Sequence, residues 1–216
     1  MIYPKHIAII PDWNRTWAKE KWLPQMLGHM EWFKRIVELS EYIFNQTWIE
    51  IFTIWWLSTE NTKNRKPEEL NYLYDLYKTI PDNLFKMLSD NQVNFKWIWS
   101  EENLPSHLIE YFRDQEKKFK YDTNKYLILA VNYWWRDEII RGINNFKNDK
   151  SRDDKTKNIS EEEFTKYLDF WNLPNIELVI RTKWDLAKRL SWFMLRWIWY
   201  AQLFFTDIKF PDFNID

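Results

Sequence analysis

The sequence predicts a single α/β domain, in which a mostly parallel sheet of about six strands is flanked by helices. Two observations support this fold class. Short runs of apolar and β-branched residues alternate with longer segments of helical periodicity, which is the pattern of strands joined by crossover helices. The length of 216 residues suits one sheet covered on both faces, and no linker-like stretch divides the chain, so residues 1–216 are expected to form one domain.

Six segments are short enough, and rich enough in aliphatic residues, to be strands. In chain order they are Ile7–Ile10, Ile49–Trp55, Val93–Ile98, Tyr126–Val131, Leu178–Ile180 and, as a weaker candidate, Leu203–Thr206. The helical segments between them are Met30–Phe44, Pro67–Asp90, Pro105–Lys120, Arg136–Asn148 and Ser160–Tyr167. Pro81 is expected to kink or split the second helix, because proline removes a helical hydrogen bond. Ser160 and Glu163 have the spacing of a capping box, which marks a helix start.

Composition excludes several classes of protein. The chain has no Cys, so disulfides, thiolate metal sites and Cys nucleophiles are ruled out. Its 31 basic and 32 acidic residues nearly cancel, which gives no support to a nucleic-acid partner. No stretch is long and apolar enough to cross a membrane, and the first residues lack the layout of a signal peptide, so we expect a cytoplasmic protein.

Polar side chains follow four of the predicted strands, at the edge where open parallel sheets bind ligands. The groups are Asp12, Asn14 and Arg15; Ser58, Glu60, Asn61 and Arg65; Asn132, Tyr133 and Arg136; and Arg181, Thr182, Arg189 and Ser191. Arginine offers a planar fork of donors to phosphate oxygens, and an Asp among phosphates suits Mg²⁺. The pattern therefore favours an enzyme that handles phosphate or diphosphate. The alternative is that these residues only cap helices and form surface ion pairs.

The same residues resemble a known family, the cis-prenyltransferases or undecaprenyl diphosphate synthases. Residues 6–18, HIAIIPDWNRTWA, are similar to the first family signature, H-x-A-x-I-x-D-G-N-x-R-W-A, and Gly28 and His29 match the G-H that follows it. Later motifs appear in family order: S-T-E-N at 58–61, N-Y-W-W-R at 132–136, I-R-T at 180–182, R-L-S at 189–191, T-D at 206–207 and P-D-F at 211–213. The resemblance covers nearly the whole chain.

The resemblance implies a parallel-sheet fold of the undecaprenyl diphosphate synthase type, usually dimeric. It implies transfer of isopentenyl diphosphate units onto an allylic diphosphate with Mg²⁺ as cofactor, giving a polyprenyl diphosphate such as the undecaprenyl carrier-lipid precursor. A homodimer with peripheral contact to the inner face of the membrane, through its lipid product, would follow. The alternative is a non-catalytic partner subunit. It is suggested by Thr16 and Gln202 at positions of a family Arg and Glu, and by a C-terminal tail that is short for the family.

By the same resemblance, Asp12 and Asn61 are the catalytic residues. Asp12 would hold Mg²⁺ and assist departure of the allylic diphosphate, with Gln202 as a doubtful second metal ligand. Asn61 would accept the condensation proton or, because an amide is a weak base, only position the reacting groups. The implied substrate-binding residues are Trp13, Asn14, Arg15, Thr16, Trp17, Gln25, His29, Ser58, Thr59, Glu60, Thr62, Arg65, Arg181, Arg189, Leu190 and Ser191.

An apolar tunnel would have to hold the growing chain. The stripe of apolar residues on the second predicted helix could line it, or could be ordinary core. Its members are Leu70, Leu73, Tyr74, Tyr77, Leu84, Phe85 and Leu88.

The main departure from the family lies in composition. The chain has 2 Gly and 16 Trp, where roughly 15 Gly are usual for this length. Trp13, Trp134, Trp135, Trp184 and Trp192 stand where the family has Gly. Seven more fall where Gly would suit the context: Trp22, Trp32, Trp48, Trp56, Trp99, Trp171 and Trp199. Four resemble genuine tryptophans: Trp17, Trp55, Trp97 and Trp197.

An indole at position 13 would obstruct the close approach of backbone to a diphosphate. One codon could explain the exchange. Some bacterial lineages read UGA as Gly, and a common alternative genetic code reads it as Trp. We therefore expect UGA at the twelve Gly-like positions and UGG at the other four.

Overall fold

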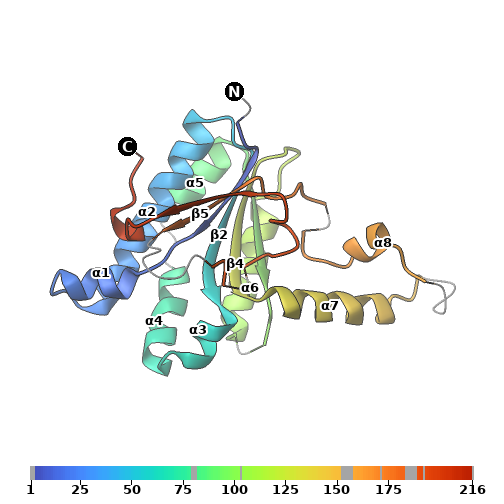
Figure 1. The fold of residues 1–216 in the computed structure, drawn as a ribbon, viewed down its shortest axis with the longest axis horizontal. Coiled ribbons are helices and arrows are strands. Elements are labelled where there is room, and N and C mark those ends of the chain that lie inside the picture. Colours follow the sequence, from blue (N-terminus) through green and yellow to red (C-terminus); the bar gives the residue numbers. More distant parts are fainter. Residues whose placement is uncertain are drawn as a thin grey trace.

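The computed structural model describes residues 3–78, 82–102, 104–151, 158–170, 172–182, 189–191 and 193–215. The described strands form one sheet in the order β3-β4-β2-β1-β5-β6, and every neighbouring pair is parallel (Figure 1). Their bounds are β1 His6–Ile10, β2 Ile51–Ser58, β3 Asn94–Trp99, β4 Tyr126–Tyr133, β5 Leu178–Thr182 and β6 Gln202–Thr206. The predicted fold class and all six strands are confirmed.

Several strands end later than the sequence indicates: β2, β4 and β5 by two or three residues and β3 by one. The pairing of β2 with β4 continues past an irregularity at Trp55–Ser58 and ends with Ser58 opposite Tyr133. This extension carries Ser58 and Asn132 to the carboxyl edge of the sheet. Apolar periodicity does not reveal these ends, because Ser58, the last residue of β2, and Asn132, the last but one of β4, are polar.

Helices cover both faces of the sheet (Figure 1). Their bounds are α1 Asn14–Glu20, α2 Gln25–Gln46, α3 Thr59–Asn64, α4 Pro67–Lys78, α5 Asp82–Asp90, α6 Ser106–Lys118, α7 Trp135–Asn148, α8 Glu161–Thr165 and the 3-10 turn η1 Phe210–Asp212. The sequence missed α1 and α3, which are too short and polar to show periodicity. It also placed the start of α2 five residues late. None of the described helices has the length and apolar character needed to cross a membrane.

Two predictions about helix ends can be compared with the structure. The segment 67–90 forms two helices, α4 and α5, but Pro81 itself lies outside the described residues. The capping box is present: the Ser160 hydroxyl accepts from the Glu163 N–H at 3.1 Å, and the Glu163 carboxylate accepts from the Ser160 N–H at 3.0 Å.

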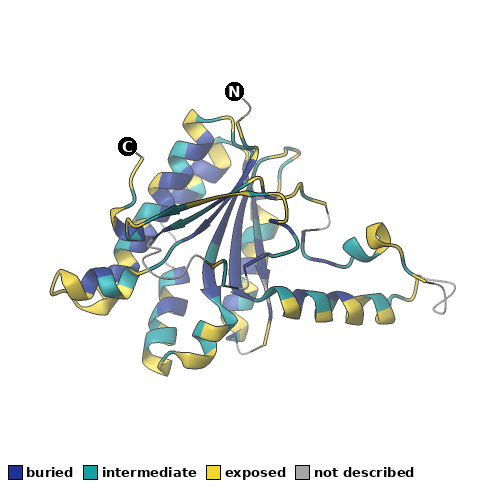
Figure 2. Ribbon diagram, viewed as in Figure 1, coloured by how far each residue is buried: buried dark blue, intermediate teal, exposed yellow. Residues whose placement is uncertain are grey.

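Alternating residues of the central strands feed two apolar cores, one on each face of the sheet (Figure 2). The larger core packs α2, α4, α5 and α6 against one face. Most of the stripe proposed to line a tunnel is buried there: Leu73, Tyr74, Tyr77, Leu84 and Leu88. Leu70 and Phe85 are partly buried against the same core. The smaller core includes residues of the segments 168–170, 173–176 and 193–198.

Candidate active site

A cavity of about 420 Å³ opens where β1, β2 and β5 end. Because all strands are parallel, their carboxyl ends bring together side chains that are far apart in the sequence. Most of the predicted site residues line this cavity: Asp12, Trp13, Asn14, Arg15, Thr16, His29, Ser58, Glu60, Asn61, Arg65, Arg181, Arg189 and Ser191. Four of these are arginines, so the cavity favours an anion.

Asp12 and Arg181 form the centre of one wall. Pairing of β1 with β5 puts Ile10 beside Arg181, and the Arg181 Nε donates to Asp12 Oδ2 at 2.7 Å. The Asp12 backbone N–H donates to Thr182 Oγ1 at 3.0 Å, which fixes the turn after β1. Burial raises the pKa of Asp12, while the charges of Arg181 and Arg189 act in the opposite direction. Arg181 also donates to Ser191 Oγ at 3.0 Å and to the Arg189 carbonyl oxygen.

Several polar atoms of the cavity residues lack partners among the described residues, the indole N–H groups of Trp55 and Trp56 among them. The Asn14 Oδ1 and the Arg65 Nε are both buried without a hydrogen bond. A buried polar atom without a partner carries a free-energy cost unless a ligand or water satisfies it. An acceptor and a donor are thus both available to a bound ligand.

Glu69 on α4 holds a second group of basic residues, and the sequence argument missed it. Its carboxylate lies 3.3 Å from His29 Nε2, 3.3 Å from Arg65 Nη1 and 3.5 Å from Arg15 Nη1. Burial, helped by the charge of Arg65, lowers the pKa of His29 to about 4, so the ring is neutral at pH 7. The one sequence signal was the spacing of four residues between Arg65 and Glu69, which suits an ion pair in a helical turn.

The end of β2 is organised by a helix cap. Ser58 Oγ accepts from the Asn61 N–H at 3.1 Å, which begins α3 and sets Glu60 and Asn61 at the cavity. Thr59 and Thr62 do not line this cavity. Instead their hydroxyls bond to Asn132, at 3.1 Å to its backbone carbonyl oxygen and 3.0 Å to its side-chain oxygen.

Four other predicted residues also lie away from this cavity. Trp17 is buried and donates from Nε1 to Asp212 at 2.7 Å. Gln25 lines a neighbouring cavity of about 440 Å³, together with Arg15, His29 and Arg65. Leu190 packs against the smaller core.

The fourth, Gln202, is exposed at the start of β6, where it pairs with Leu178. It is therefore at the opposite end of the parallel strands from Asp12. The expectation that these two residues share a metal is not met within one chain.

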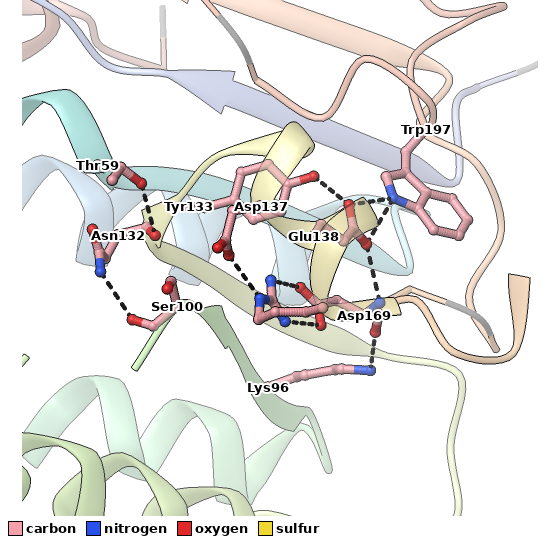
Figure 3. Close-up of polar contacts among 10 residues, drawn as sticks. Thr59, Lys96, Ser100, Asn132, Tyr133, Asp137, Glu138, Asp169 and Trp197 are labelled. Atoms are coloured by element: carbon pink, nitrogen blue, oxygen red, sulfur yellow. Dashed lines mark hydrogen bonds and ion pairs between the residues drawn. The ribbon is translucent and has the colours of Figure 1, made fainter. Parts of the chain in front are cut away.

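A buried polar cluster supports the end of β4 from behind (Figure 3). Glu138 accepts from Tyr133 Oη at 2.5 Å, from the Asp169 N–H at 3.0 Å and from Trp197 Nε1 at 3.2 Å. Burial and the charge of Asp169 raise the pKa of Glu138 to about 7. Arg141 holds Asp169 through two bonds of 2.9 and 2.7 Å. The cluster joins β4, α7 and the segments around 169 and 197.

Comparison with known proteins identifies the family. The family model for undecaprenyl diphosphate synthase matches residues 10–216. An isoprenyl transferase of Fusobacterium nucleatum is 35% identical over 98% of this chain and 87% of its own length. The ditrans,polycis-undecaprenyl-diphosphate synthase ((2E,6E)-farnesyl-diphosphate specific) of Micrococcus luteus is 34% identical over 98% of this chain and 84% of its own.

A solved structure agrees with the sequence relatives. Lavandulyl diphosphate synthase from Lavandula x intermedia, in complex with dimethylallyl diphosphate, superposes with a TM-score of 0.79 at 28% identity, over 98% of this chain and 90% of that one. The parallel sheet, the cavity at its carboxyl edge and the sequence relatives define a prenyltransferase. The chain belongs to the undecaprenyl diphosphate synthase family of isoprenyl transferases.

Proposed function

We propose that this chain condenses isopentenyl diphosphate units onto an allylic diphosphate to make a polyprenyl diphosphate, of the length used as the undecaprenyl carrier-lipid precursor. The main supporting observation is the cavity that Asp12 lines together with four arginines, Arg15, Arg65, Arg181 and Arg189. In this reaction the allylic carbon–oxygen bond breaks and the diphosphate leaves, a carbon–carbon bond forms, and the isopentenyl unit loses a proton. Both substrates are anions, so a cationic cavity suits them.

Within this proposal, the residues divide into two groups. Asn14, Arg15, His29 and Arg65 would bind the allylic diphosphate, and Arg181, Arg189 and Ser191 the isopentenyl diphosphate. Ser58, Glu60 and Asn61 would orient the reacting carbons between them. The neutral ring of His29 can donate a hydrogen bond to a phosphate oxygen without adding charge.

The residues present also fit Mg²⁺. Among the described residues no cluster of three or more His, Asp or Glu side chains could hold a metal alone. Mg²⁺, however, is usually held by one or two carboxylates together with substrate phosphates. Asp12 supplies a carboxylate beside the proposed diphosphate positions. The bound ion would neutralise the charge that develops on the leaving diphosphate.

Replacing the Asp12 carboxylate tests the proposal directly. In the protein with glycine at the twelve Gly-like positions, Asp12→Asn should abolish incorporation of labelled isopentenyl diphosphate, because the metal contact and the charged partner of Arg181 are both lost. Asp75→Asn, at an exposed carboxylate on α4, is the matched control and should keep its activity. Equal activity of the two variants would contradict the role of Asp12. The non-catalytic alternative would be supported by a different result: a folded chain that has no turnover alone but activates a homologous subunit.

We also propose a homodimer formed through the β6 side of the molecule. β6 is an edge strand, and Leu203 and Phe204 are 46% and 52% exposed. Exposed apolar edge strands ordinarily pair or are covered. Sedimentation velocity should give a dimer for the wild type and a monomer for Phe204→Lys. A wild-type monomer at micromolar concentration would contradict the proposal.

A peripheral contact with the cytoplasmic face of the membrane would let the lipid product leave. The start of α2 carries four partly exposed apolar residues, Leu23, Met26, Leu27 and Met30, and Met26 borders the cavity that contains Arg15 and His29. The chain should co-sediment with phosphatidylglycerol vesicles, and Met26→Ser with Leu27→Ser should reduce binding. Ile140→Ser with Ile143→Ser, at exposed positions of α7, is the control. Equal loss in both double variants would exclude the α2 surface.

A further inference from the structure

Two tryptophans have a backbone conformation that suits glycine. Trp13, between β1 and α1, has a φ of 75°, and Trp22, between α1 and α2, has a φ of 58°. This left-handed region crowds the Cβ of a bulky residue against the backbone, whereas glycine enters it without cost. No glycine among the described residues occupies it. The turns before and after α1 therefore each hold a bulky tryptophan in a backbone conformation that suits glycine.

The two glycines that the chain does have occupy places where a side chain cannot fit easily. A Cβ on Gly28 would lie 2.2 Å from the Asn14 carbonyl oxygen, and one on Gly142 would lie 2.8 Å from Leu168 Cδ2. Both glycines therefore lie where elements pack closely. The turns at positions 13 and 22, where most proteins would use glycine, have tryptophan instead.

Exposure divides the tryptophans into two kinds. Trp22, Trp48 and Trp199 are 95%, 85% and 78% exposed, although tryptophan is ordinarily among the more buried residues. Trp17 and Trp197 are buried, and their indole N–H groups donate to Asp212 and Glu138. Buried tryptophans usually have such a partner, so these two behave as genuine tryptophans.

Trp32 on α2 and Trp56 on β2 fill the space between these elements and α4. Their ring centroids lie 5.1 Å apart, and Trp56 also packs 4.8 Å from Tyr77. Both indoles are buried, and neither N–H has a hydrogen-bond partner in the described part of the chain. The same is true of the Trp55 N–H, so the positions of Trp32 and Trp56, rather than their missing partners, are what matters here. Trp56 also lines the candidate active-site cavity. Glycine at both positions would open an apolar space that is continuous with that cavity.

We propose that the functional protein carries glycine at positions 13, 22, 32, 48, 56 and 199, encoded by UGA, and tryptophan at 17 and 197. We call the protein with glycine at all twelve Gly-like positions the glycine form, and the sequence as printed the tryptophan form. In the glycine form the backbone at position 13 is bare toward the cavity. The space at positions 32 and 56 is free to take an isoprenoid chain, a consequence that rests on the proposed function.

The coding sequence and the natural protein test this assignment without any assay of activity. We expect UGA at codons 13, 22, 32, 48, 56 and 199, and UGG at codons 17 and 197. Peptide mass spectrometry of the protein from its native cells should show glycine at the first set. UGG at codons 13 and 22, or tryptophan in those peptides, would overturn the proposal.

Thermal unfolding of single variants of the tryptophan form gives an independent test. Trp22→Gly should raise the melting temperature by roughly 2–4 °C, because it relieves a left-handed backbone at an exposed site. Trp197→Gly should lower it, because a buried ring and its bond to Glu138 are lost. A lower melting temperature in both variants would contradict the assignment. Neither readout depends on prenyl transfer, so failure of the proposed function would be seen separately.

Discussion

Glu69 shows how one side chain can organise a site that sequence motifs describe only in part. Its carboxylate contacts Arg15, His29 and Arg65, which come from three different elements. Two arginines so close together would repel each other without a shared anion between them. We therefore propose that Glu69 is a positioning residue, which holds both guanidinium groups at the cavity where a diphosphate would bind.

Removing this carboxylate should weaken substrate binding. In the glycine form, Glu69→Ala should lower kcat/KM for the allylic diphosphate by about tenfold or more, the effect of roughly 1.4 kcal/mol of lost positioning. Most of the change should appear in KM. Glu68→Ala removes the exposed neighbouring carboxylate on the same helix and is the control. Steady-state kinetics that show the same loss in both variants would argue against a positioning role.

At the scale of elements, the contact between α1 and α2 sets the position of the residues after β1. Gly28 on α2 lies against the Asn14 carbonyl oxygen at the start of α1. This close approach holds Asn14 and Arg15 at the cavity. Gly142, on α7, is close to a leucine methyl group, which can move more easily than backbone.

The two glycines should therefore respond differently to the same added methyl group. Gly28→Ala should lower the free energy of unfolding by about 1–3 kcal/mol, and should lower activity, because α1 must shift. Gly142→Ala should cost less, since Leu168 can change its side-chain conformation. Urea unfolding of both variants measures the difference. A larger loss at Gly142 would contradict this account of the α1–α2 contact.

The elements that sequence patterns could not predict are those nearest the site. The six strands and the larger helices could be predicted from their apolar residues, because burial of one face gives the sequence a periodic pattern. The short helices α1 and α3 have mostly polar residues and depend on caps such as Ser58, which periodicity does not report. The motifs predicted that Asp12, Asn61 and Arg181 lie at one cavity, where the structure has them. They did not indicate Glu69, and they did not indicate that Gln202 lies at the start of β6, away from Asp12. The contacts of Glu69 depend on tertiary packing, and the position of Gln202 depends on the direction of β6.

For the whole molecule, Glu138 links folding stability to pH. Its pKa in the folded protein is raised to about 7, from an ordinary value of 4.5. Between these values the unfolded chain has released the proton while the folded chain still holds it. The contribution of Glu138 to stability is therefore complete below about pH 4.5, is lost as the pH rises to about 7, and is then constant.

Comparison of Glu138→Gln with the wild type should isolate this contribution. The free energy of unfolding of the wild type, minus that of the variant, should fall as the pH rises from 4.5 to 7. Chemical denaturation across this range measures it. Glu162→Gln, at an exposed carboxylate of α8, should leave the pH profile unchanged. A difference that rises with pH would show that Glu138 is ionised in the folded protein.

The chain belongs to a family of prenyltransferases, and we propose that its site requires glycine where the sequence has tryptophan. The most direct test is the incorporation of labelled isopentenyl diphosphate, with farnesyl diphosphate as the allylic substrate, by the glycine form. We predict Mg²⁺-dependent formation of a long polyprenyl diphosphate by the glycine form and little or none by the tryptophan form. A folded glycine form that makes no prenyl product with farnesyl or longer allylic diphosphates would contradict the account.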